Sequence, residues 1–213
     1  MEIISLKHVI PNIFEDGETH SEVWLQEVTF QKGQQYLVEA ASGTGKTSLC
    51  SFVYGDRRDY RGEIRFDGQD VRNLSSAQLE ELRREHLSIV FQDLKLFPEL
   101  TAFENVLVKN QLTGYKKEEE IRDLFVRLGI ADKLGSRADK LSLGQQQRVS
   151  FIRALCQPFD FIILDEPISH LDQANAEVIS GILTEEVKRQ GASALVTSLG
   201  VTLKLDYDKI LKL

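Results

Sequence analysis

Hydrophobic residues follow two different periods along the chain, and segments of the two kinds alternate. Short apolar or alternating segments predict strands. They cover residues 3–9, 23–30, 36–39, 62–66, 87–91, 159–164 and 194–197, with a short strand at the C-terminus. Turns are predicted at the polar segment 15–21 and at Asp67 and Gly68. Segments of helical period begin near Lys46, run through 101–110, 142–156 and 173–189, and include one helical face formed by Ile121, Leu124, Phe125 and Leu128. This alternation predicts an α/β fold with a mostly parallel sheet covered by helices.

The middle of the chain is helical rather than alternating. Ser75 with Gln78 and Thr101 with Glu104 have the spacing of a capping box, which favours helices that begin there. Because no Pro/Gly/Ser-rich linker divides the 213 residues, we expect one domain over 1–213. Its α/β core is predicted over 1–91 and 158–213, and about 92–157 is predicted to be an inserted helical subdomain.

Composition limits which partners the chain is expected to bind and in which compartment it is expected to work. The net charge of −7 argues against sequence-independent binding of nucleic acid, which needs a basic surface. Cys50 and Cys156 lack metal-ligand spacing and lie in apolar helical segments, so we expect buried, reduced thiols. The N-terminus has no signal-peptide pattern, and no apolar run approaches the roughly 20 residues that span a bilayer. A membrane role would therefore require a partner.

The segment 40–47, AASGTGKT, follows a predicted strand and opens a predicted helix. Glycines in such a loop let backbone N–H groups point at phosphate oxygens, and the helix N-terminus adds positive potential. In a phosphate loop, Lys46 would reach the β- and γ-phosphates, and the Thr47 hydroxyl would bind Mg²⁺. Ala40 replaces the usual first glycine, which is tolerable if its φ is negative. The alternative is a small-residue turn that caps a helix. The candidate ATP-binding residues here are Ser42, Gly43, Thr44, Gly45, Lys46, Thr47 and Ser48.

A second candidate site follows the apolar segment 159–164, which ends in Asp165, Glu166 and Pro167. The carboxyl ends of strands in α/β sheets are where such folds bind ligands. Asp165 is the candidate Mg²⁺ ligand, and Glu166 is the candidate catalytic base that polarises water. The alternative is an acidic turn after a core strand.

Together with three further motifs, these segments resemble the ABC (ATP-binding cassette) ATPases over nearly the whole chain. The further motifs are 89–92 (IVFQ), 141–148 (LSLGQQQR) and 169–172 (SHLD), and the acidic segment matches the family over 161–167 (FIILDEP). The resemblance implies a P-loop NTPase core with an antiparallel β part at its N-terminal end and the inserted helical subdomain. Residues 94–106, LKLFPELTAFENV, are similar to the small lipoprotein-release, macrolide-export and cell-division group.

The resemblance also implies roles for single residues. Gln92 would touch Mg²⁺ or the attacking water. Ser142, Gly144 and Gln145 would open a helix that meets the γ-phosphate held by the opposite subunit, although Ser142 and Gln145 also read as a plain capping box. Leu143 stands where the family usually has glycine.

Three positions of the resemblance remain open. Asp172 is either part of the family's D-loop or only the N-cap of the following helix. Phe14 is the candidate for stacking on adenine, with Ile13 as the alternative alignment. Ser198 occupies the position of the family's switch histidine, so it is a catalytic candidate that cannot carry positive charge.

The function implied is an ATPase with ATP and Mg²⁺ as cofactors, paired with a second copy of itself and with integral membrane transporter subunits. Its expected location is cytoplasmic, peripheral on the inner face of the cell membrane. Phe97, Pro98 and Phe103, just after Gln92, are predicted either to contact the membrane partner or to pack locally. The alternative function is an ATP-gated dimeric module that hydrolyses little and signals to a membrane partner.

Overall fold

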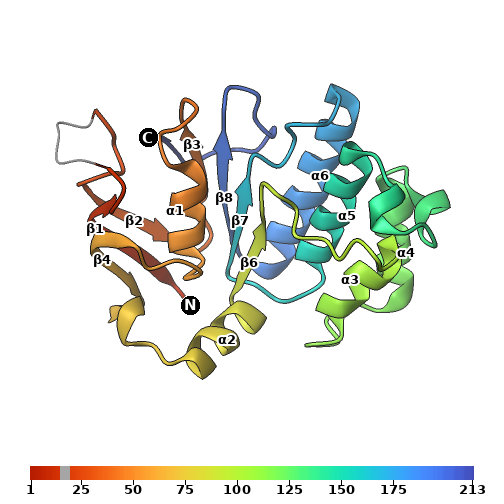
Figure 1. The fold of residues 1–213 in the computed structure, drawn as a ribbon, viewed down its shortest axis with the longest axis horizontal. Coiled ribbons are helices and arrows are strands. Elements are labelled where there is room, and N and C mark those ends of the chain that lie inside the picture. Colours follow the sequence, from red (N-terminus) through yellow and green to blue (C-terminus); the bar gives the residue numbers. More distant parts are fainter. Residues whose placement is uncertain (15–19) are drawn as a thin grey trace.

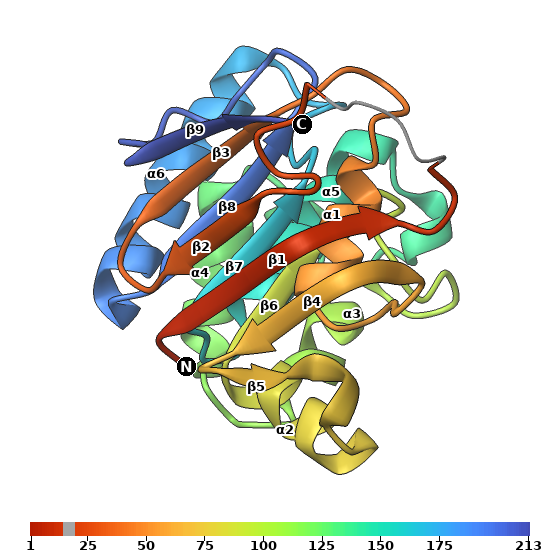
Figure 2. The same cartoon turned by 90° about the vertical axis from the view of Figure 1, so that its left-hand side faces the viewer.

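The computed structural model describes residues 1–14 and 20–213, so the predicted polar turn at 15–21 lies largely outside the described residues. A parallel five-stranded sheet has the order β6-β7-β8-β3-β9. Its strands are β3 (Gln35–Glu39), β6 (Leu87–Val90), β7 (Phe161–Asp165), β8 (Ser193–Ser198) and β9 (Lys209–Lys212). Beside it lies a four-stranded sheet of order β2-β1-β4-β5 (Figures 1 and 2). Its strands are β1 (Ile3–Pro11), β2 (Glu27–Gln31), β4 (Tyr60–Phe66) and β5 (Gln69–Asp70).

The strands β6, β7 and β8 are buried on both faces of the parallel sheet, which explains why they read as largely apolar runs, whereas the edge strand β9 is mostly exposed. Along β7, Phe161 and Ile163 pack into one core cluster, whereas Ile162 and Leu164 pack into the other. The first cluster joins this sheet to the antiparallel sheet, with α1 (Lys46–Val53) lying between the sheets (Figure 2). The second joins it to the helices on its other face.

The remaining helices are α2 (Ser76–Glu85), α3 (Ala102–Asn110), α4 (Glu118–Arg127), α5 (Leu143–Leu155) and α6 (Gln173–Gln190). Short 3-10 turns lie at Val71–Asn73, Ala131–Lys133 and Ala138–Lys140. Both predicted capping boxes ahead of α2 and α3 are confirmed, because each N-cap hydroxyl and its N3 side chain bond the other's backbone N–H. Helices α3, α4, α5 and α6 gather on the side of the sheet away from β1 and β4 (Figure 1).

The antiparallel sheet confirms the strand predictions for 3–9 and 62–66, and the expected turn at Asp67 and Gly68 joins β4 to β5. β1 changes register between Lys7 and Ile10, where a β-bulge lies opposite β4. Gly62 faces this bulge with φ +88°, and a Cβ there would lie 2.3 Å from the His8 carbonyl oxygen. The close approach of the two backbones therefore requires glycine.

The predicted strand 23–30 is wrong over its first half. β2 begins at Glu27, and residues 21–26 form a turn instead. The Ser21 hydroxyl oxygen accepts hydrogen bonds from the backbone N–H groups of Val23 (3.0 Å) and Trp24 (2.8 Å). Leu25 has φ +61°, outside the strand region. The run of apolar residues made this segment resemble a strand, but Val23 and Trp24 are buried within a turn and Leu25 is exposed.

The two cysteines are free and buried, as predicted. Among the described residues, no helix has the length and apolar character needed to cross a membrane.

Candidate functional site

The loop 40–47 leaves β3 and enters α1 at the carboxyl end of the parallel sheet (Figure 1). Gly43 and Gly45 have φ of +83° and +96°, which a side-chain-bearing residue rarely adopts. Ala40 does not have a positive φ, so alanine can replace the usual glycine at this position. Ser42 is exposed at the loop's rim, whereas the Ser48 hydroxyl accepts a hydrogen bond from Arg57 (3.2 Å).

Lys46 and Glu166 meet directly at this edge. The Lys46 Nζ lies 3.3 Å from Glu166 Oε1, and the two side chains are only 6% and 8% exposed. The same ammonium group donates a hydrogen bond to the carbonyl oxygen of Ala41 (3.0 Å). The ammonium group therefore bridges the backbone of the loop and the carboxylate of Glu166, directly after β7.

Oxygen ligands converge beside this pair. The Thr47 hydroxyl donates to Gln92 Oε1 (2.9 Å), and the Thr197 hydroxyl donates to Asp165 Oδ1 (2.8 Å). Burial raises the pKa of the Asp165 carboxyl, while the hydroxyls of Thr47 and Thr197 oppose that rise. A hydroxyl, an amide oxygen and a carboxylate are ligands that suit Mg²⁺, so this donor set fits the ion. Thr47, Gln92 and Asp165 would hold it.

The aromatic candidate Phe14 lies against the loop rather than apart from it. Its ring is 6.4 Å from that of Trp24 and nearly perpendicular to it. A Cβ built on Gly45 would lie 3.3 Å from Phe14 Cζ. The alternative, Ile13, is 80% exposed.

The start of α5 packs against a different loop from the phosphate loop 40–47 of the same chain. Ser142 caps α5 through the predicted capping box with Gln145. Gly144 packs against the next loop, since a Cβ there would lie 2.9 Å from the His170 carbonyl oxygen. Within residues 1–14 and 20–213, no hydrogen bond or ion pair joins these residues to the loop 40–47. Asp172 caps α6 by accepting from the Asn175 N–H (2.8 Å).

Comparison with known proteins then identifies the family. A family model described as "ABC transporter" matches residues 26–169, more than half of the chain. The chain belongs to the ABC transporter family. It is 34% identical over 190 residues to the macrolide export ATP-binding/permease protein MacB of Rhodopseudomonas palustris, covering 88% of this chain. It is 39% identical over 156 residues to the uncharacterized ABC transporter ATP-binding protein YclH of Bacillus subtilis, covering 71% of this chain and 68% of YclH.

The chain spans about a third of the MacB relatives, 29% of one and 32% of another. Among solved structures it resembles the dimeric structure of MJ0796, a bacterial ABC transporter cassette, with a TM-score of 0.85 and 25% identity. That match covers 99% of this chain and 94% of the other. A post-hydrolysis state of MJ0796 bound to ADP and phosphate matches with a TM-score of 0.81 and 26% identity. These matches confirm the fold class predicted from the sequence.

One residue of this ABC cassette had no role assigned from the sequence. Gln147, on α5, is almost fully buried; its Nε2 donates to the Glu166 carbonyl oxygen (3.2 Å), and its Oε1 accepts from the His170 N–H (3.2 Å). It thus holds the turn after β7, where Glu166 has a strained φ of +49°. Its place in the segment 141–148 was the only signal available, because the contact joins residues distant in sequence.

Ser198, which the resemblance predicts to occupy the position of the family's histidine, is buried and bonded within its own turn. Its hydroxyl donates to the Val201 carbonyl oxygen (2.7 Å) and accepts from the Gly200 N–H (3.0 Å). Ser198, Glu166 and Val201 line one hollow of about 230 Å³. The structure therefore brings Ser198 near Glu166, with its hydroxyl engaged elsewhere.

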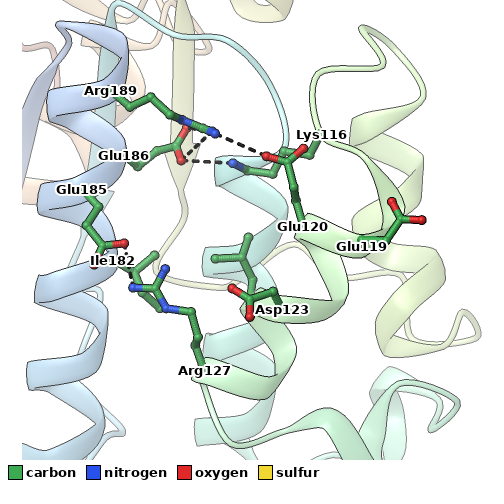
Figure 3. A pocket seen from close by; sticks show the side chains of 10 residues that line it. Lys116, Glu119, Glu120, Asp123, Arg127, Ile182, Glu185, Glu186 and Arg189 are labelled. Atoms are coloured by element: carbon green, nitrogen blue, oxygen red, sulfur yellow. Dashed lines mark hydrogen bonds and ion pairs between the residues drawn. The ribbon is translucent and has the colours of Figure 1, made fainter.

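A larger hollow, about 390 Å³, lies between α4 and α6 and contains no predicted site residue (Figure 3). At its edge, Lys116 Nζ and Glu186 Oε2 are 3.0 Å apart with side chains 4% and 8% exposed. Tyr115, Arg189 and Gln190 also donate to the Glu186 carboxylate. This network ties the segment before α4 to α6 and has the character of a structural ion-pair cluster.

Proposed function

We propose that this ABC cassette binds and hydrolyses ATP as a dimer with a second copy of itself, around two ATP–Mg²⁺ sites, and drives a membrane-embedded transporter part. The observation that carries the proposal is the pairing of Lys46 with Glu166 beside the oxygen cluster of Thr47, Gln92 and Asp165. Phosphate-binding, metal-binding and proton-accepting groups thus meet at one sheet edge. The dimeric MJ0796 cassettes support a dimer.

In this proposal the chain's own groups divide the work. Lys46 exchanges its contacts with Ala41 and Glu166 for phosphate oxygens, and loop N–H groups orient the same phosphates. Mg²⁺, when bound, neutralises charge on the β- and γ-phosphates. Glu166, released from Lys46, accepts a proton from the attacking water at its carboxylate. Phe14 stacks on adenine, and Ser142 and Gly144 of the second copy complete the γ-phosphate site.

For the membrane part, we propose docking at the hollow of about 210 Å³ beside Gln92's segment, which Phe97, Lys109 and Arg153 help to line. Phe97 is 48% exposed, in contrast to Phe103, which packs against the helical core cluster. Burial lowers the pKa of Lys109 to about 8 and that of Arg153 to about 10. Such docking would hold the cassette at the inner face of the cell membrane.

The decisive experiment measures ATP hydrolysis with Mg²⁺ and with EDTA, alone and with the permease that co-purifies with the chain. We expect Mg²⁺-dependent hydrolysis that Lys46→Ala removes. Glu166→Gln should give a dimer with ATP and Mg²⁺ but much less with ADP, measured by size-exclusion chromatography with light scattering. Phe97→Ala should lose stimulation by the permease while ATP binding stays unchanged. Hydrolysis equal to the Lys46→Ala background, even with the permease, would contradict the proposal.

A second candidate function is an ATP-gated dimeric module with little hydrolysis. The observation that favours it is Ser198, whose hydroxyl is bonded to Val201 and Gly200 rather than directed to a phosphate site. Single-turnover hydrolysis at saturating ATP separates the two, because the module would bind and dimerise without producing ADP.

A further inference from the structure

Trp24 packs against the phosphate loop and lies in the turn at 21–26, where the sequence pattern predicted a strand. Its side chain is only 2% exposed. Ser21 holds the turn by accepting the Trp24 backbone N–H (2.8 Å). The indole is packed edge-on by the rings of Phe14 and Phe52, each with its centroid 6.4 Å away. The Trp24 backbone is therefore held by Ser21, and its indole lies between the rings of Phe14 and Phe52.

The indole contacts the loop in two ways. Its Nε1–H donates a hydrogen bond to the Thr44 carbonyl oxygen (2.9 Å). A Cβ at Gly45 would lie 3.1 Å from Trp24 Cζ2, so the backbone rests on the ring. The Thr44 hydroxyl meanwhile donates to the Ala41 carbonyl oxygen (2.9 Å), which closes the loop on itself.

We propose that Trp24 is a positioning residue for the phosphate loop. The idea rests on the proposed function, in which this loop binds the phosphates of ATP. In a planar trans peptide, the Thr44 carbonyl and the Gly45 N–H point in opposite directions. The bond from Trp24 therefore turns the Gly45 N–H away from the indole and toward the bound phosphate. Because the donor is already oriented, binding does not have to order it.

The test compares Trp24→Phe with Phe52→Leu. The first keeps an aromatic ring but removes the N–H donor; the second loosens the packing around Trp24 and leaves its bond to Thr44 in place. Affinities for ATP and for inorganic tripolyphosphate are measured by calorimetry, and kcat and KM by steady-state hydrolysis. Tripolyphosphate carries no base, so it reports on the phosphate loop alone.

Trp24→Phe should weaken both ligands by a similar factor of roughly 3 to 10, as expected for one lost neutral hydrogen bond. The KM for ATP should rise by the same factor, whereas kcat should stay within about twofold, because Glu166 still accepts the proton. Phe52→Leu should lower the melting temperature without changing either affinity.

Three results would overturn the proposal: unchanged affinities in Trp24→Phe, equal losses in Phe52→Leu, or a loss confined to ATP, which would assign Trp24 to the base instead. Should Trp24→Phe fail to fold, the unaltered protein decides. Trp24 is the chain's single tryptophan, and phosphate charge bound at the Gly45 N–H acts on the indole through the Thr44–Gly45 peptide to which it is hydrogen-bonded. Its emission should therefore shift when tripolyphosphate binds, and an unchanged spectrum at saturation would also refute the idea. ATP binding equal in the unaltered protein and Lys46→Ala would instead reject the proposed function.

Discussion

Two buried lysine–glutamate pairs lie in different parts of this molecule and look alike by distance and burial. Lys46 and Glu166 are 3.3 Å apart and 6% and 8% exposed. Lys116 and Glu186 are 3.0 Å apart and 4% and 8% exposed. Removing either pair from water has a similar cost, and neither distance nor burial alone tells which pair is functional.

The surroundings of the two carboxylates separate them. Glu186 receives further donors from Tyr115, Arg189 and Gln190. Although burial works against it, Arg189 and Lys116 hold the pKa of Glu186 below its usual value. For Glu166, no other side chain of the described residues donates to the carboxylate, and its backbone φ is +49°. A satisfied pair fixes structure. A strained, under-satisfied pair can exchange partners with a ligand.

The largest effect expected from this contrast is on catalysis. Glu166→Gln keeps the side chain's shape but cannot accept a proton, so ATP hydrolysis should fall by about 10²–10⁴. The matched change at the other pair, Glu186→Gln, should leave kcat within a few-fold, because that carboxylate lies between α4 and α6. Single-turnover ADP production measures both. A comparable loss in both variants would show that the two pairs are not functionally distinct.

For the free energy of unfolding we expect the opposite order: replacing Lys116 should cost more than replacing Lys46. Lys116→Met removes one donor from the buried Glu186 carboxylate, which keeps its contacts with Arg189, Tyr115 and Gln190; the loss of this charged hydrogen bond should cost about 2 kcal/mol of the free energy of unfolding. Lys46→Met should cost about 1 kcal/mol, because Glu166 lines a hollow into which it can turn. Urea unfolding of both variants checks this, and equal losses would contradict the contrast drawn between the two pairs.

The sequence predicted the sheet, the helices and the phosphate loop because each depends on local pattern: period two, period 3.6, capping boxes and glycines. It misplaced residues 21–26, where Ser21 and Trp24 form a turn held by contacts to the loop around Thr44. It also could not show that Gln147 supports the Glu166 turn. Such contacts join residues far apart in the chain, and no local period encodes them.

A third prediction concerns pH and Asp165. Burial raises the folded-state pKa of this carboxyl above its unfolded value. The folded state therefore binds the proton more tightly, and stability from this group is lost as pH rises through the folded pKa. At neutral pH, Asp165→Asn should raise the melting temperature of the nucleotide-free protein while removing Mg²⁺-dependent hydrolysis. The difference should shrink as the pH falls toward about 4. A gain that grows in acid would reverse the sign and contradict the prediction.

The smallest effect is expected at Ser198. This residue lies beside Glu166, but its hydroxyl already has hydrogen-bond partners within the protein, as the Glu186 carboxylate does. Its hydroxyl donates to Val201 and accepts from Gly200, so both of its bonds close a turn. Ser198→Ala removes both of these turn contacts, each worth about 1 kcal/mol of stability, but because neither reaches the phosphate site it should slow hydrolysis by no more than about fivefold. Ser198→His supplies the family's residue and should accelerate hydrolysis if the hollow beside Glu166 admits an imidazole. Single-turnover rates at saturating ATP rank these variants against Glu166→Gln. A Ser198→Ala protein as inactive as Glu166→Gln would mean that the hydroxyl leaves its turn to act on the phosphate. In that case, satisfied hydrogen bonding would not distinguish structural from catalytic groups at this edge.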